Sequence, residues 1–201
     1  MSFFENTRKP EGFGGKIMVA MMNVGHSAVA RWGLQFLNAA PDARVLDCGC
    51  GGGANMKRLL KKCPQGIVKG IDYSPVSVEK SKKVNDDAIA KGRCVVLQGS
   101  VAALPFKTDE FDAVTAFETV YFWSDLSRCF QEVYRVLKPG GTFLICNESN
   151  GDSDKDERWT EIIGGMTIYK DAELKTYLEQ AGFHDVQIHK KKSWLCITAR
   201  K

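Results

Sequence analysis

Long apolar runs are missing from this chain of 201 residues. The longest, such as Ala113–Val120, are much shorter than a membrane-spanning helix requires. The N-terminal segment Met1–Glu11 also lacks a basic stretch followed by an apolar one, which is the pattern of a signal peptide. These absences predict a cytoplasmic protein without a membrane partner.

The signatures of nucleic-acid and metal-binding modules are missing as well. The net charge is +4, but the basic residues form short clusters (Lys57–Lys62, Lys80–Lys83 and Lys190–Lys192) that are typical of solvated surfaces. No basic tract is interleaved with aromatic residues. Among seven cysteines, Cys48 and Cys50 have the wrong spacing for a zinc knuckle, and most others lie in apolar runs as reduced thiols would. We therefore expect no metal site, and a nucleic-acid partner is disfavoured.

What the sequence does contain is an alternation of short apolar strands with amphipathic helices. The length suits one α/β domain with a buried core, and no internal repeat divides it. The predicted strands are Ala43–Cys48, Gly66–Asp72, Arg93–Gln98, Phe111–Phe117, Thr142–Asn147, Asp185–Lys190 and Trp194–Ala199. The predicted helices are Gly25–Ala39, Ala54–Lys62, Pro75–Ala90, a helix between Asp125 and Pro139, and Asp171–Ala181.

Repeated β-α-β units require right-handed crossovers and a parallel sheet covered on both faces. Only three residues separate the last two strands, which predicts a hairpin. The predicted fold is therefore α/β: a doubly wound, Rossmann-like, seven-stranded and mostly parallel sheet with a C-terminal antiparallel hairpin. We expect one domain over residues 1–201, with 1–40 as an N-terminal lid and 41–201 as the core. The Met-rich run Met18–Met22 would belong to that lid.

The first strand ends in Asp47, and the glycine-rich loop Gly49–Gly53 follows it. A doubly wound sheet binds ligands at the carboxyl ends of its strands, where glycines allow close backbone approach. The second strand ends in Asp72, 19 residues beyond Gly53, where an acid can accept both hydroxyls of a ribose. The alternative interpretations are that the glycines only form a tight structural turn and that Asp72 only caps a helix. Because Ala54 follows Gly53, the loop also nearly matches the glycine-rich fingerprint of nicotinamide-dinucleotide-binding proteins.

Three later segments reduce the weight of these alternatives. They are Gln98–Phe106 with its Leu-Pro-Phe end, Phe111–Val114, and Glu132–Gly141 with its Arg-Val-Leu-Lys-Pro-Gly-Gly end. In their order and spacing, these segments and the glycine loop resemble the class I S-adenosylmethionine-dependent methyltransferases. The resemblance covers roughly Val45–Lys201 and favours S-adenosylmethionine over a nicotinamide cofactor.

The resemblance implies a role for each of ten cofactor-binding residues. At the methionine end, Asp47 would order the glycine loop, Phe117 would lie near the sulfur, and the methionine part would be contacted by Gly49, Cys50 and Gly51. Asp72 would hold the ribose, and Tyr73 would pack beside the adenine. The adenine edge would be framed by Gly99, Ser100 and Val101. Many family members have an acid where Ser100 stands. Here a hydroxyl or a backbone carbonyl must accept from the adenine amino group.

Catalytic residues are not defined by the sequence, because a general base is needed only if the acceptor is protonated. The candidates are His26, Glu118 and Tyr121; a cap, an exposed carboxylate and a packing aromatic are the respective alternatives. No Asn-Pro-Pro-aromatic tetrad follows the fourth strand, which favours a small-molecule acceptor. An RNA or protein methyltransferase, a non-catalytic cofactor-binding module and, more remotely, a nicotinamide-dependent oxidoreductase are the other hypotheses. The oligomeric state stays open.

Overall fold

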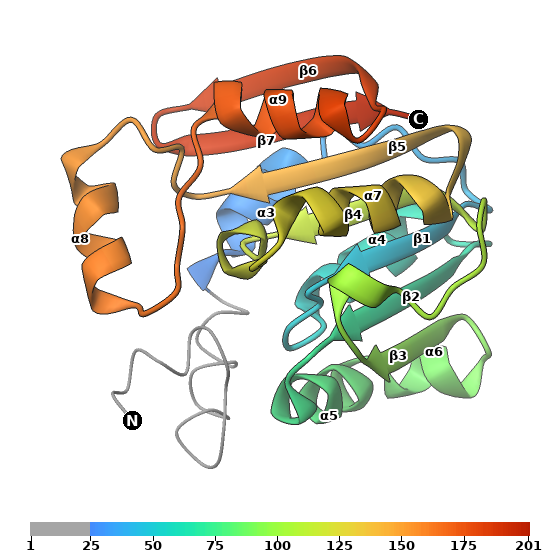
Figure 1. The fold of residues 1–201 in the computed structure, drawn as a ribbon. Coiled ribbons are helices and arrows are strands. Elements are labelled where there is room, and N and C mark those ends of the chain that lie inside the picture. Colours follow the sequence, from blue (N-terminus) through green and yellow to red (C-terminus); the bar gives the residue numbers. More distant parts are fainter. Residues whose placement is uncertain (1–24) are drawn as a thin grey trace.

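A seven-stranded sheet with helices on both faces forms the body of the computed structural model, which describes residues 25–201 (Figure 1). The strand order is β3-β2-β1-β4-β5-β7-β6. The strands are β1 (Arg44–Cys48), β2 (Ile67–Asp72), β3 (Cys94–Gln98), β4 (Phe111–Phe117), β5 (Leu137–Asn147), β6 (His184–Lys191) and β7 (Trp194–Arg200). β1 to β5 pair in parallel, and β7 lies antiparallel between β5 and β6. The predicted fold class is confirmed.

The helices divide between two apolar cores, one on each face of the sheet. They are α3 (Ser27–Gly33), α4 (Ala54–Lys62), α5 (Pro75–Val84), α6 (Asp86–Ala90), α7 (Leu126–Val136), α8 (Asp154–Ile162) and α9 (Asp171–Gln180), with short 3-10 turns η1 (Val101–Ala103) and η2 (Val120–Phe122). α7 and α9 bury apolar side chains on one face, and α3, α4 and α5 on the other. The sheet is thus covered on both sides, which explains why its central strands β1 and β4 carry mostly buried, apolar side chains.

The helix predicted for Pro75–Ala90 is interrupted at Asn85, so that prediction is wrong in its middle. It begins as expected, with the Ser74 hydroxyl accepting from the amide of Ser77 at 3.4 Å and proline in the first turn. Asn85 is buried and its side-chain amide donates to the carbonyls of Gly53 and Ser81, at 3.1 and 2.9 Å. This side chain therefore ties the end of α5 to the glycine loop.

Two further boundaries differ from prediction. The helix predicted for Gly25–Ala39 ends at Gly33, after which the backbone continues in tighter turns with hydrogen bonds three residues apart. β5 starts at Leu137, since that residue pairs with Phe111 ahead of a register shift at the Pro-Gly-Gly segment. Of the lid predicted for residues 1–40, residues 1–24 lie outside the described residues. In the described part, no helix has the length and apolar character needed to cross a membrane.

Candidate cofactor and acceptor site

A cavity of about 440 Å³ opens at the carboxyl ends of β1, β2 and β4. All of the ten predicted cofactor residues except Asp47 line it. Its wall consists of His26, Gly49, Cys50, Gly51, Gly52, Ala54, Asn55, Arg58, Asp72, Tyr73, Ser77, Gly99, Ser100, Val101, Ala102, Phe117, Glu118, Thr119, Phe122, Trp123, Ser124 and Cys129. Segments predicted separately along the chain therefore meet in one place, as the strand-end rule for doubly wound sheets requires.

The glycine loop is held by backbone hydrogen bonds and needs its glycines. Gly49 has a φ of 73°, and a Cβ there would collide with the side chain of Thr119. Gly53 has a φ of 80° and lies against Ser81 and Asn85. The amides of Gly49 and Cys50 both donate to the carbonyl of Ile71, at 2.8 and 3.0 Å. These two amides are therefore engaged within the protein, which leaves the surface of the loop for contact with a ligand.

Asp72 closes the opposite side of the loop. Its two carboxylate oxygens accept from the amides of Gly51 and Ser74, each at 2.9 Å. Burial raises the pKa of this carboxyl, while the two backbone hydrogen bonds oppose that rise. A carboxylate oxygen has further acceptor capacity after one hydrogen bond. Asp72 can thus hold the loop and accept ligand hydroxyls in the cavity at the same time.

Ser100 uses its hydroxyl oxygen within the protein. It accepts from the amide of Ala102 at 3.2 Å and so caps the turn η1. The hydroxyl proton stays available for donation, whereas the remaining acceptor capacity is smaller than that of the acid found in many relatives.

Tyr73, the residue predicted to pack beside the adenine, also lines the cavity, and 40% of its surface is exposed.

Asp47 lies beneath the cavity instead of in its wall, with only 1% of its surface exposed. The hydroxyl of Thr115 donates to its Oδ1 at 2.7 Å. Burial raises the pKa of Asp47 to about 7; the Thr115 hydrogen bond lowers it, and the nearby charge of Asp72 adds to the rise. This carboxyl therefore titrates near neutral pH. Its role in ordering the glycine loop stays a prediction.

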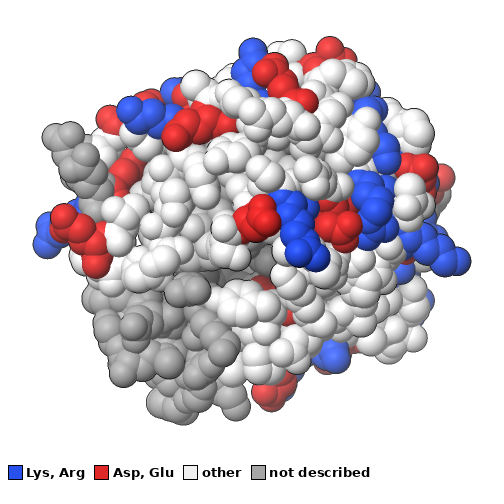
Figure 2. Space-filling model, viewed as in Figure 1, with Lys and Arg blue, Asp and Glu red and all other residues white. Residues whose placement is uncertain are grey.

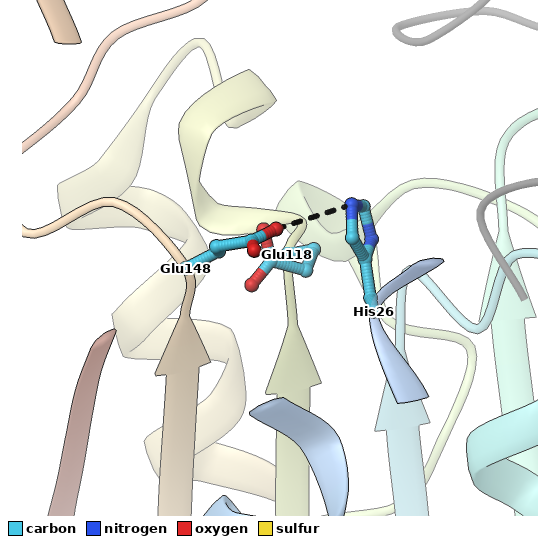
Figure 3. A group of neighbouring side chains, drawn as sticks. All are labelled: His26, Glu118 and Glu148. Atoms are coloured by element: carbon cyan, nitrogen blue, oxygen red, sulfur yellow. Dashed lines mark ion pairs between the residues drawn. The ribbon is translucent and has the colours of Figure 1, made fainter. Parts of the chain in front are cut away.

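Two of the three catalytic candidates, His26 and Glu118, come together, and Glu148 joins them (Figure 3). His26 lies at the start of α3, Glu118 directly follows β4, and Glu148 directly follows β5. His26 Nε2 is 3.7 Å from Glu148 Oε2. Burial lowers the pKa of His26, while the charge of Glu148 opposes that fall, so burial favours the neutral imidazole.

Glu118 has an unusual backbone, with a φ of 58°, and its amide donates to the carbonyl of Cys146 at 2.9 Å. Burial, followed by the charge of Glu148, raises the pKa of its carboxyl well above the ordinary value. Tyr121, the third candidate, is buried outside the cavity wall. Its hydroxyl accepts from the Ser149 amide at 2.9 Å and donates to the Ser149 carbonyl at 3.3 Å. Tyr121 thus lies outside the cavity wall, although its hydroxyl is within hydrogen-bonding reach of the Glu118 carboxyl.

Sequence reasoning missed Glu148 and Arg58. Arg58 lies on α4 in the cavity wall, where its guanidinium donates to Asn55 Oδ1 at 2.8 Å and to Ser27 Oγ at 2.6 Å. Glu148 follows a strand that ends at the same edge as β1 and β4, so the rule that identified Asp47 and Asp72 applied to it too. No such signal marks Arg58, because it is one of several lysines and arginines on α4.

A doubly wound sheet with a glycine loop after β1, an acid after β2 and an antiparallel β7 between β5 and β6 is the arrangement that the resemblance to class I S-adenosylmethionine-dependent methyltransferases implies. Residues 46–145 match the model of a family described as "Methyltransferase domain". This match assigns the chain to that family of methyltransferase domains.

Relatives with named functions agree with this assignment. Cycloartenol-C-24-methyltransferase of Arabidopsis thaliana is 31% identical over 157 residues, which are 73% of this chain and 46% of the relative. The chain thus spans less than half the length of that relative. "Uncharacterized methyltransferase YdaC" of Bacillus subtilis is 25% identical over 90% of this chain and 96% of its own length. A solved S-adenosylmethionine-dependent methyltransferase from Aquifex aeolicus shares the fold, with a TM-score of 0.77 at 19% identity over 92% of this chain and 97% of its own.

Proposed function

We propose that this chain is an enzyme that transfers the methyl group of S-adenosylmethionine to a small molecule. The observation that carries the proposal is the convergence of the glycine loop, Asp72 and Phe117 on one cavity. Methyl transfer from a sulfonium is an in-line displacement, for which the cofactor supplies the reactivity. The protein's task is to hold the acceptor atom on the line of approach and to exclude competing water. Phe117, at the end of β4, is proposed to border the sulfur.

A small acceptor is favoured by the size and character of the cavity. A volume of about 440 Å³ lies in the range of small-molecule pockets, and Phe117, Phe122 and Trp123 give it an apolar side. The relative from Arabidopsis is named for methylating cycloartenol, a small apolar molecule. Lysine, arginine and acidic residues are interspersed on the face shown in Figure 2, so this face offers no continuous basic surface for RNA.

Calorimetric titration with the product S-adenosylhomocysteine tests cofactor binding. We expect saturable binding to the wild type, and about 10- to 100-fold weaker binding to Asp72→Asn, because one charge-assisted acceptor for ribose is lost. The matched control is Asp87→Asn, an exposed carboxylate on α6, which should bind as the wild type does. Absence of binding at millimolar ligand, or equal affinity in both variants, would contradict the proposed site.

Catalysis is tested separately, by release of S-adenosylhomocysteine from S-adenosylmethionine in the presence of a panel of small hydroxyl, amine and alkene acceptors. Acceptor-dependent release supports the enzyme. Binding without release for every acceptor, including protein and RNA samples, would instead support a non-catalytic binding module. Release that occurs only with RNA or protein would assign a macromolecular substrate.

A further inference from the structure

The cluster of His26, Glu118 and Glu148 lies beside the proposed methyl-transfer site. Figure 3 shows the three side chains pointing toward one another from the start of α3 and from the ends of two neighbouring strands. His26 and Glu118 line the cofactor cavity, next to Phe117. The methyl-transfer chemistry described above assigns no task to two carboxylates and an imidazole at this position.

Distances within the cluster suit a shared central atom better than direct hydrogen bonds. One ligand atom from each residue lies within 4.8 Å of the others. The 3.7 Å between His26 Nε2 and Glu148 Oε2 exceeds the length of a hydrogen bond. Cation–ligand bonds of about 2.0–2.6 Å separate adjacent ligands by about 3–3.7 Å and opposite ligands by about 4–5 Å. The separations in the cluster fall in that range.

An independent observation is the state of the Glu118 carboxyl. Its Oε1 is buried and has no hydrogen-bond partner in the described structure. A hydrogen bond from the Glu148 amide reaches this carboxyl without satisfying Oε1. A buried carboxylate oxygen without a partner is costly, and beside a second carboxylate it is costlier still. Glu118 also adopts a left-handed backbone, which is a strained conformation for a non-glycine residue.

A shared proton does not account for this arrangement. A proton held between Oε1 of Glu118 and a second carboxylate would require a short oxygen–oxygen hydrogen bond, and Oε1 makes none. A proton on Glu118 alone would remove the charge and leave His26 and Glu148 unconnected. A positively charged centre larger than a proton can contact all three groups at the observed separations.

We propose that His26, Glu118 and Glu148 bind a divalent cation of the Mn²⁺, Fe²⁺ or Zn²⁺ type at the acceptor end of the cavity. The imidazole nitrogen favours these ions over Ca²⁺ and Mg²⁺, which prefer oxygen ligands alone. A neutral imidazole and two carboxylates supply two negative charges, which balance the charge of the ion. Three protein ligands leave coordination positions open, as in metal sites that also bind substrate.

Titration of the full chain with Mn²⁺, followed by electron paramagnetic resonance of the free ion, tests the proposal. The expected result is one bound Mn²⁺ per chain, displaced by Zn²⁺, with at least about 10-fold weaker binding in Glu148→Gln, Glu118→Gln and His26→Gln. Glu148 is exposed, so Glu148→Gln leaves the folded core untouched. The matched controls are Glu161→Gln and His184→Gln, which alter exposed residues elsewhere and should bind Mn²⁺ as the wild type does.

The outcomes separate this proposal from the proposed function. Failure to bind Mn²⁺ at millimolar concentration, or equal weakening in cluster and control variants, overturns the metal site. S-adenosylhomocysteine titrated into the same proteins reports the cofactor site independently, and we expect Glu148→Gln to retain that binding. Mn²⁺ binding without S-adenosylhomocysteine binding would instead support the metal site and contradict the methyltransferase proposal.

Discussion

Asp47→Asn should make the fold more stable at neutral and alkaline pH. Asp47 is fully buried, and burial raises the pKa of its carboxyl from the ordinary 3.8 to about 7. Asparagine has nearly the same shape, and its carbonyl oxygen can still accept from Thr115. The substitution therefore removes the titration of this group while preserving the packing around it.

The sign and size of the effect follow from proton linkage. Below pH 3.8 the carboxyl is protonated in both folded and unfolded chains. Between 3.8 and about 7 the unfolded chain ionises while the folded chain keeps its proton, so the free energy of unfolding falls as pH rises. Above about 7 the loss is complete, at about 4 kcal/mol. Between pH 5 and pH 8 the expected loss is about 2.5 kcal/mol.

Urea unfolding of wild type and Asp47→Asn at pH 5 and pH 8 measures this directly. The stability of the variant relative to wild type should increase by about 2.5 kcal/mol between the two pH values, because other titrating groups are common to both proteins. Asp87→Asn, on the surface, should show no comparable change. A difference between Asp47→Asn and wild type that is the same at pH 5 and pH 8 would refute the reasoning, since it would mean that Asp47 is ionised in the fold at both.

Three further outcomes are expected. Gly53→Ala should lower the free energy of unfolding by more than about 2 kcal/mol, because φ is +80° and the new Cβ would lie 2.5 Å from Ser81 Oγ. Gly92→Ala is the comparison: its φ is +68° but its Cβ would meet no atom within 4 Å, so the free energy of unfolding should fall by only about 1 kcal/mol. Phe130→Ala should cost about 3–5 kcal/mol in the same urea assay, because Phe130 is fully buried among aromatic rings. All seven cysteines are free and buried, so a thiol reagent should label less than one per native chain and all seven after unfolding.

The fold could be predicted because local and global signals agree. Apolar strands, the cap at Ser74 and the Pro-Gly-Gly stop each mark a boundary that the structure places within a few residues. The break at Asn85 could not be predicted, since it depends on a carbonyl of the glycine loop 32 residues earlier. Contacts of that kind exist only once α4 and α5 lie side by side on the sheet.

The proposed cofactor half of the cavity could be predicted from sequence for a related reason. Its residues lie on consecutive strand ends and short loops, so that the chain order of Gly49, Asp72 and Ser100 already contains their spatial order. The contribution of Arg58, by contrast, depends on the side-chain direction of one residue among several basic neighbours on α4. Periodicity indicates which face of a helix is buried, but not which polar side chain reaches a cavity at its edge.

The acceptor half combines residues whose proximity depends on strand register. Phe117, the last residue of β4, pairs with Cys146, the second-last residue of β5, so Glu118 and Glu148 leave the sheet at nearly the same level. The left-handed backbone of Glu118 turns the chain there, and its side chain then meets Glu148 and the start of α3. Register and a single strained φ angle have no signature in one sequence. They nevertheless determine that two carboxylates and an imidazole meet at the edge of the cavity, where the proposed cation would bind.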